Sequence, residues 1–257
     1  MADLSRGPWL AATPRPQADV RLNAGVEATA LRPRSALVAG GTGLVGSHLL
    51  EQLAGRPDYE RIISLVRRRV ASPARVESRI IDFAELERYE LDAEVDDCFC
   101  ALGTTMRTAG SKEAFRRVDF DAVVGFARLG LAHGAERFVL VSAVGADERS
   151  RNFYLRVKGE AEMAVAALGF RAVEILRPSL LLGDRAEQRP TEVLATRAAR
   201  FVKPLLAGPL AAYRPVDAAV VATAMLRAAH RPGDGRHIYA GDDIRQLAAA
   251  GRLASPS

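Results

Sequence analysis

Lysine is the scarcest charged residue in this chain of 257 amino acids. Only Lys112, Lys158 and Lys203 occur, and arginine supplies the rest of the 36 basic residues. The position of each lysine is therefore informative. The chain also has no uninterrupted apolar run of about 18 residues, the length that a membrane-spanning helix needs. No membrane contact is expected.

Cysteine and histidine are also scarce, with two and four residues. Cys98 and Cys100 stand two apart in a predicted strand, so their side chains share one face and cannot readily form a disulfide. Free thiols fit a reducing compartment. These few residues offer no metal-ligand spacing, and no bound metal is expected.

The first 33 residues mix proline with arginine and lack the apolar core of a secretory signal peptide. We expect a flexible tail over 1–33 and a cytoplasmic protein. The net charge is +5, but no basic run exceeds three arginines. Charge spread in this way is typical of a solvated surface, so no nucleic acid partner is expected.

Short apolar runs alternate with amphipathic segments from residue 35 onward, which is typical of a parallel sheet covered by helices on both faces. Strands are predicted at 35–40, 61–67, 78–82, 97–102, 137–143 and from 172 towards 182. Helices are predicted at 43–54, 112–133 and 153–168. We expect an α/β protein with a doubly wound parallel sheet, the Rossmann fold.

The chain beyond the sixth strand is too short for an independent second domain. It holds predicted helices at 191–206, 216–229 and 244–252, and a strand at 236–240. We therefore expect a single domain over 34–257, with a small C-terminal substrate cap at about 184–257.

The turn after the first predicted strand is rich in glycine and reads GGTGLVG. Glycine lets the pyrophosphate of a dinucleotide approach the backbone, and the start of the next helix offers free N–H groups to it. The spacing satisfies both G-x-x-G-x-x-G and G-x-G-x-x-G. The predicted phosphate-binding residues are Gly40, Gly41, Thr42, Gly43, Leu44, Val45 and Gly46.

The end of the second predicted strand indicates which dinucleotide binds. An NAD enzyme usually carries an acid there, which binds the adenosine ribose. This chain carries Arg67 and Arg68 instead, and arginine pairs with a 2′-phosphate. NADP(H) is therefore favoured over NAD(H), unless the arginines simply belong to an exposed loop. Asp82 and Phe83, after the third strand, are candidate contacts to the adenine.

Tyr154 and Lys158 are four residues apart near the start of a predicted helix, so both side chains can face one cleft. A free tyrosine has a pKa of about 10, and a nearby lysine cation is expected to lower it. Ser142, at the end of the fifth strand, would bind the substrate oxygen. We predict Ser142, Tyr154 and Lys158 as catalytic residues. Tyr154 and Lys158 are also assigned to the cofactor site, where the lysine can hold the nicotinamide ribose.

With these features in order, the sequence resembles the short-chain dehydrogenase/reductase superfamily, and its glycine spacing resembles the atypical branch. The stretches CALGTT from Cys100, YLRVKGE from Tyr154 and the pair Arg177-Pro178 look like the Tat-interacting-protein family of NADP(H)-binding oxidoreductases. The resemblance covers roughly 35–250. It implies the catalytic roles above and adds to the cofactor-binding set Leu102, Gly103, Arg177 and Pro178.

Two positions depart from the pattern of this family. Asp119 stands on the helix where many relatives have asparagine, and Ser179 stands where glycine commonly follows Arg-Pro. Whether Asp119 serves a proton relay or supports the structure is left open by the sequence.

The leading hypothesis is an NADP(H)-dependent oxidoreductase of an unidentified small carbonyl or alcohol, acting as a monomer or homodimer. One alternative is an NADPH-binding regulatory or redox-sensing protein with little turnover, which would not need the tyrosine. Another is a sugar-nucleotide epimerase or dehydratase, whose substrate usually needs a larger cap. The fold is compatible with all three.

Overall fold

The computed structural model describes residues 33–182 and 214–250. The chain divides into two units, Met1–Leu31 and Arg32–Ser257, and every described residue belongs to the second. The tail expected over 1–33 lies outside the described residues except for Pro33, and the helix expected at 191–206 lies wholly outside them.

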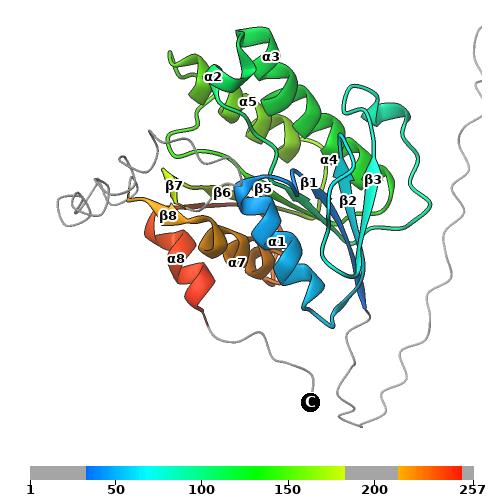
Figure 1. Cartoon of the computed structure of the whole chain (residues 1–257). Helices are drawn as coiled ribbons and strands as arrows, with labels where there is room; N and C mark the ends of the chain where they lie inside the picture. Colours follow the sequence, from blue (N-terminus) through cyan, green and yellow to red (C-terminus); the bar gives the residue numbers. More distant parts are fainter. Residues whose placement is uncertain (1–32, 183–213, 251–257) are drawn as a thin grey trace, which may run out of the picture. The chain divides into compact units, whose positions relative to one another are not determined.

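Parallel strands form the central sheet, in the order β3-β2-β1-β4-β5-β6-β9 (Figure 1). Their bounds are β1 Arg34–Ala39, β2 Tyr59–Val66, β3 Val76–Ile80, β4 Asp97–Cys100, β5 Arg137–Val141, β6 Ala172–Arg177 and β9 Gly235–Ala240. The chain moves outward in opposite directions from the neighbouring strands β1 and β4, and in sheets of this kind ligands bind beyond the carboxyl ends of the strands at this point. The prediction of a doubly wound α/β fold is confirmed.

Helices cover both faces of this sheet, one set on each side (Figure 1). The first face carries α1 (Leu44–Ala54), α7 (Ala218–Ala229) and α8 (Asp242–Ala249), and the second carries α4 (Ala122–Ala132) and α5 (Phe153–Ala166). Along β1, Ala36 and Val38 join the core of the first face, whereas Leu37 and Ala39 join that of the second. This alternation is the two-residue period of a strand.

The helix predicted at 112–133 contains a π-helical turn. Its segments are α3 (Lys112–Arg116), the π turn η2 (Arg117–Asp121) and α4. Turns of this kind are frequent at functional sites. A four-residue helix, α2 (Met106–Ala109), precedes it and was not predicted from the sequence. It begins after Thr105, whose hydroxyl accepts a hydrogen bond from the Thr108 N–H at 3.1 Å.

The described part of the predicted cap range contributes to the main layers. α7 packs on α1, and β9 forms one edge of the central sheet. β8 (Val216–Asp217) pairs with β7 (Leu181–Leu182) in a separate two-stranded sheet. β6 ends at Arg177 instead of continuing towards 182, because the next residue is Pro178, which has no N–H for the ladder.

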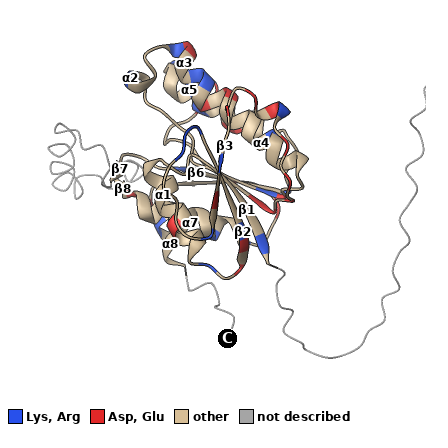
Figure 2. Ribbon diagram, turned by 45° about the vertical axis from the view of Figure 1, so that its right-hand side comes forward, with Lys and Arg blue, Asp and Glu red and all other residues tan. Residues whose placement is uncertain are grey.

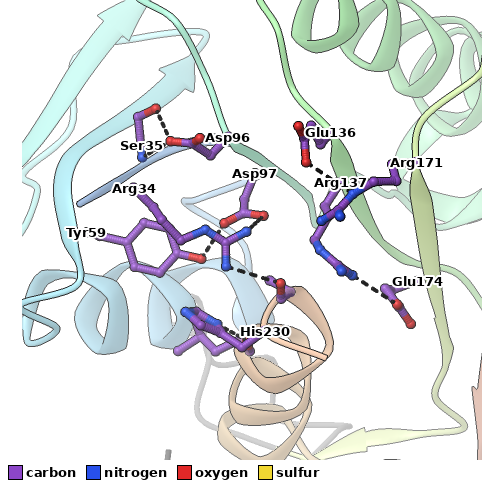
Figure 3. A network of polar contacts seen from close by, with 12 residues as sticks. Arg34, Ser35, Tyr59, Asp96, Asp97, Glu136, Arg137, Arg171, Glu174 and His230 are labelled. Atoms are coloured by element: carbon purple, nitrogen blue, oxygen red, sulfur yellow. Dashed lines mark hydrogen bonds and ion pairs between the residues drawn. The ribbon is translucent and has the colours of Figure 1, made fainter. Parts of the chain in front are cut away.

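Charged side chains are buried at the amino ends of the strands (Figure 3). Asp97 of β4 is fully buried, forms an ion pair with Arg34 and accepts a hydrogen bond from the Tyr59 hydroxyl at 2.7 Å. On β5, Arg137 lies 3.7 Å from the buried carboxylate of Glu174. These pairs link β1 to β4 and β5 to β6, away from the carboxyl edge of the sheet.

Basic and acidic residues are interspersed along the ribbon (Figure 2). Within 33–182 and 214–250, no helix is long and apolar enough to cross a membrane, and no cluster of His, Cys, Asp and Glu could hold a metal ion. Cys98 and Cys100 are free thiols buried in the same core cluster, as their spacing predicts.

Candidate active site

The predicted site residues outside α1 and α5 lie at the carboxyl edge of the sheet, because they follow the ends of parallel strands. The turn at Gly40 follows β1, Arg67 and Arg68 follow β2, Asp82 and Phe83 follow β3, Leu102 and Gly103 follow β4, Ser142 follows β5, and Pro178 follows β6. Residues far apart in the sequence are thereby brought to one edge.

The glycine turn is closely packed against backbone on both sides. Gly40 has a φ of +83°, and a Cβ there would lie 2.4 Å from the carbonyl carbon of Ala101. A Cβ on Gly46 would lie 2.1 Å from the carbonyl oxygen of Gly40. Only glycine fits at these two positions, which agrees with the roles predicted for the turn.

The N-terminus of α1 faces this turn and suits an anion. Gly43, the residue before the helix, provides no side-chain cap, and the first turn holds no acidic residue. Thr42 and Gly43 are exposed. The free N–H groups and the positive end of the helix dipole are therefore accessible to a phosphate group. The close glycine packing and the free helix end fit the pyrophosphate of a dinucleotide.

The residues predicted for the adenosine half of the cofactor lie farther along the same edge. Arg67 and Arg68 are exposed, and neither forms a hydrogen bond or ion pair with another residue that the structure describes. The Asp82 carboxylate accepts a hydrogen bond from the Ala84 N–H at 2.9 Å, and Phe83 is half-buried beside the core. Their contact with a cofactor stays a prediction.

Lys158 is buried on the face of α5 that also carries Tyr154. Its ammonium lies 2.8 Å from Oδ1 of Asp119, which comes from the π turn. Burial is the largest single effect and lowers the pKa of Lys158, but the nearby Asp119 carboxylate, together with smaller effects of Tyr154 and Cys100, raises the pKa overall. The lysine is therefore a cation held inside the protein.

Tyr154 is partly buried, and its ring centre lies 5.4 Å from that of Phe115. Burial raises the pKa of Tyr154, Lys158 lowers it, and Asp119 raises it again. The pKa is raised overall, whereas the sequence led us to expect a decrease caused by the lysine. The difference arises because the phenol is shielded from water and because Asp119 offsets the lysine charge.

Ser142 and Tyr154 line one cavity, whose volume is about 370 Å³. The Ser142 hydroxyl is buried and has no hydrogen-bond partner among the described residues. Since buried hydroxyl groups normally have a partner, this oxygen is available to a ligand in the cavity. The other residues of the lining are Ala143, Val144, Pro178, Ser179, Leu180 and Leu181.

Arg177 makes an ion pair within the protein. Its Nε donates a hydrogen bond at 3.0 Å to Glu162, which is buried on α5. Its guanidinium therefore joins β6 to α5, and a role in cofactor binding stays a prediction. Ser179 donates a hydrogen bond to the carbonyl oxygen of Arg214 at 2.5 Å. This contact links the chain after β6 to the segment before β8.

Asp119 is the residue of the candidate site whose contacts the sequence did not reveal. The sequence marked it as a departure, but the ion pair with Lys158 depends on how the π turn meets α5. A signal was nevertheless present. Phe115 and Val123, four residues before and after it, are apolar and buried in the structure. A carboxylate on such a helix face indicates a buried partner of opposite charge.

Sequence comparisons identify relatives over most of the described chain. The model of the NAD dependent epimerase/dehydratase family matches residues 36–241. Protein HTATIP2 of Rattus norvegicus is 37% identical over 172 residues, which cover 65% of this chain and 71% of that protein. Protein fmp52-1 of Aspergillus terreus is 31% identical over 208 residues, which cover 78% of this chain and 89% of that protein. These matches confirm the resemblance inferred from the motifs.

The prediction of a cytoplasmic location is wrong in view of these relatives. Protein FMP52 of Eremothecium gossypii, 38% identical over 152 residues that cover 59% of this chain and 68% of that protein, is named as mitochondrial. The fmp52-1 protein of Aspergillus terreus is named in the same way. Free cysteines do not distinguish one reducing compartment from another.

Solved structures of low sequence identity share the fold. MoeE5 in complex with UDP-glucose and NAD is 18% identical, with a TM-score of 0.59 over 84% of this chain and 81% of that one. UDP-N-acetylglucosamine 4-epimerase from Bacillus cereus is also 18% identical, with a TM-score of 0.58 over 80% of this chain and 79% of that one. From the family match and the curated relatives, this chain belongs to the NAD dependent epimerase/dehydratase family of atypical short-chain dehydrogenase/reductase proteins, together with HTATIP2 and FMP52.

Proposed function

We propose that the chain is an NADP(H)-dependent oxidoreductase that acts on a small carbonyl or alcohol. The observation that carries this proposal is the shared cavity of Ser142 and Tyr154, at the same sheet edge as the glycine turn. A volume of about 370 Å³ suits a small substrate. A bound dinucleotide would supply or accept the hydride.

The side chains then have separate roles. Tyr154 donates a proton from its hydroxyl to the substrate oxygen during reduction and takes it back during oxidation. The unpartnered hydroxyl of Ser142 binds the same oxygen and orients the substrate. Lys158 is held in place by Asp119 and supplies a fixed positive charge one helical turn from the phenol.

The preference for NADP(H) over NAD(H) is part of the proposal. Arg67 and Arg68 are exposed directly after β2, where an acid would bind the ribose hydroxyls of NAD. Two guanidinium groups at this place favour a 2′-phosphate, because they can form charge-assisted hydrogen bonds with it.

A sugar-nucleotide epimerase or dehydratase is the second candidate, and the family match favours it. MoeE5 in the structural comparison holds UDP-glucose and NAD. Both functions would use Ser142, Tyr154 and Lys158, so the fold and these three residues do not separate them. They differ in whether NADPH is consumed: an oxidoreductase consumes one NADPH for each carbonyl reduced, whereas an epimerase regenerates its cofactor.

The test is NADPH oxidation over a panel of small aldehydes and ketones, with UDP-sugars assayed in parallel. Tyr154→Phe should lower the rate of carbonyl reduction by about 100-fold or more, because it removes the proton donor. Tyr89→Phe, a partly buried tyrosine outside the cavity, is the matched control and should keep the rate. Equal activity of Tyr154→Phe and the native protein would overturn the mechanism. Conversion of a UDP-sugar without net NADPH loss would favour the second candidate.

The native assembly is proposed to be a monomer or a homodimer. Light scattering on the purified chain distinguishes the two, and a larger assembly would contradict the proposal.

A further inference from the structure

The cavity at the candidate active site has mainly apolar walls. The chain after β5 contributes Ala143 and Val144, and the chain after β6 contributes Pro178, Leu180 and Leu181. Among the described residues that line the cavity, none carries a charge. Such walls favour an apolar ligand, because its binding removes carbon surface of both partners from water.

Three hydroxyl groups complete the lining, those of Ser142, Tyr154 and Ser179. The Ser179 hydroxyl is already donated to the carbonyl oxygen of Arg214. The hydroxyls of Ser142 and Tyr154 each have one proton to donate, and the proposed reaction needs both at the reacting oxygen. Within the described lining, no side-chain donor is then left for a second polar group of the substrate.

Main-chain hydrogen bonds fix the two walls of the cavity. The Val144 N–H donates to the Pro178 carbonyl oxygen at 3.0 Å, which joins the wall after β5 to the wall after β6. The Val216 N–H donates to the Leu180 carbonyl oxygen at 3.0 Å, which joins the second wall to β8. Because both walls are already ordered, a ligand that fits between them does not have to order them on binding.

Leu180 is the one residue of the described lining that is exposed, whereas the others are buried or half-buried. It is 54% exposed although its main chain is anchored to β8. Its neighbour Leu181 packs partly against the core. Leu180 therefore offers carbon surface at the wall of the cavity that a bound ligand would cover.

We propose that the substrate is an uncharged carbonyl compound whose reacting carbonyl is its one polar group, and whose aliphatic or aromatic remainder packs against Val144, Leu180 and Leu181. This inference rests on the oxidoreductase function proposed above, and it names the class of substrate. The hydride donor must share the volume of about 370 Å³ with the substrate, so the substrate itself is small.

A sugar or an anionic substrate fits these walls poorly. Each extra hydroxyl would exchange its hydrogen bonds to water for contact with apolar side chains, which weakens binding about tenfold or more. A phosphate or carboxylate would need a cationic partner. The guanidinium of Arg214, whose carbonyl oxygen meets Ser179, lies 3.7 Å from the carboxylate of Asp242 on α8. This cation is thus already paired within the protein.

The test compares aldehydes of matched size in an assay of NADPH oxidation by the full chain, with each rate corrected for the hydrated fraction of the aldehyde. Pentanal and glyceraldehyde have equal numbers of non-hydrogen atoms, as do hexanal and succinic semialdehyde. In each pair kcat/KM should be at least about 100-fold higher for the apolar aldehyde. From propanal to hexanal it should rise about fourfold for each added methylene group.

Variants of Leu180 test the assigned wall. Leu180→Asn replaces the leucine by a polar side chain of similar size, and should reduce the gain per methylene group to less than about twofold. Leu180→Met restores an apolar surface and should keep the fourfold gain. Ile238→Asn is the matched control, because Ile238 is also an exposed aliphatic residue but lies on β9, outside the described lining. It should leave the gain unchanged.

Equal rates within the pairs, or a preference for glyceraldehyde or succinic semialdehyde, would overturn the inference and leave the oxidoreductase function in place. An unchanged gain in a folded Leu180→Asn would overturn it as well. If no aldehyde is reduced, the binding of hexanamide decides, since an amide needs no hydride transfer to bind. Ligand-observed NMR with NADPH present measures this binding. Binding that weakens in Leu180→Asn would support the apolar site although the oxidoreductase function fails, and no binding would overturn both.

Discussion

Gly46 should not tolerate even the smallest side chain, since a Cβ there would lie 2.1 Å from the Gly40 carbonyl oxygen. The next nearest atoms, at 2.7 and 2.8 Å, are also backbone, so no flexible side chain can yield. The turn and α1 must separate by roughly 1 Å to admit the methyl group of Gly46→Ala. We expect a loss of about 3 kcal/mol in the free energy of unfolding, the upper end of the range for overpacking.

For a domain of this size, that loss corresponds to a decrease in Tm of about 6–12 °C. The same opening displaces the amides of the phosphate-binding turn, so the affinity for NADPH should fall at least about tenfold. Urea unfolding and nicotinamide fluorescence measure the two effects separately. The decrease in the free energy of unfolding depends on packing alone. The decrease in affinity for NADPH also requires that the cofactor binds at this turn, so it tests the proposed site.

Gly55→Ala is the matched control at the other end of α1. Its φ is −82°, and the nearest atom to a new Cβ lies 3.6 Å away. We expect this variant to be unchanged or more stable by less than about 1 kcal/mol, with native affinity for NADPH. The reasoning is refuted if Gly46→Ala unfolds at the same urea concentration as Gly55→Ala.

Two further predictions concern buried acids. Burial raises the pKa of Asp97 from 3.8 to about 7 although Arg34 opposes it, so the folded protein binds the extra proton in this interval. The stability that this proton contributes is fully present at low pH and is lost as the pH rises through the folded-state pKa of about 7. The free energy of unfolding falls by at most about 1.4 kcal/mol for each pH unit. Asp97→Asn should abolish this slope in urea unfolding measured across the interval, and an identical slope would contradict the assignment. Glu162→Gln should lower the free energy of unfolding by about 1–3 kcal/mol, because Arg177 loses its charged partner; native stability in the same assay would contradict this.

The layers of the fold could be predicted because their signals are local. Each of the strands β1, β4 and β5 holds a continuous apolar run after its first one or two residues, and the turn GGTGLVG marks the passage from β1 to α1. α2 escaped prediction because it is only four residues long. The π turn escaped because it differs from an α-helix in the hydrogen-bond pattern and not in composition.

The candidate site was predictable only in part. The spacing of Tyr154 and Lys158 is a property of one helix, so the sequence places them on a common face. The ion pair of Lys158 with Asp119 joins two helices and depends on tertiary packing. The pKa of Tyr154 is raised by burial and by the charge of Asp119, whereas Lys158 considered alone predicted that it would be lowered.

The most direct test of the account is a titration of the full chain with NADPH and with NADH, followed by nicotinamide fluorescence. We predict that NADPH binds at least about tenfold more tightly, and that the double variant Arg67→Ala/Arg68→Ala loses this preference while it keeps its affinity for NADH. Arg88→Ala, an exposed arginine on the short helix at Leu86–Arg88, should bind both as the native protein does. Tighter binding of NADH would contradict the assignment of the arginines, and failure to bind either dinucleotide would contradict the function itself.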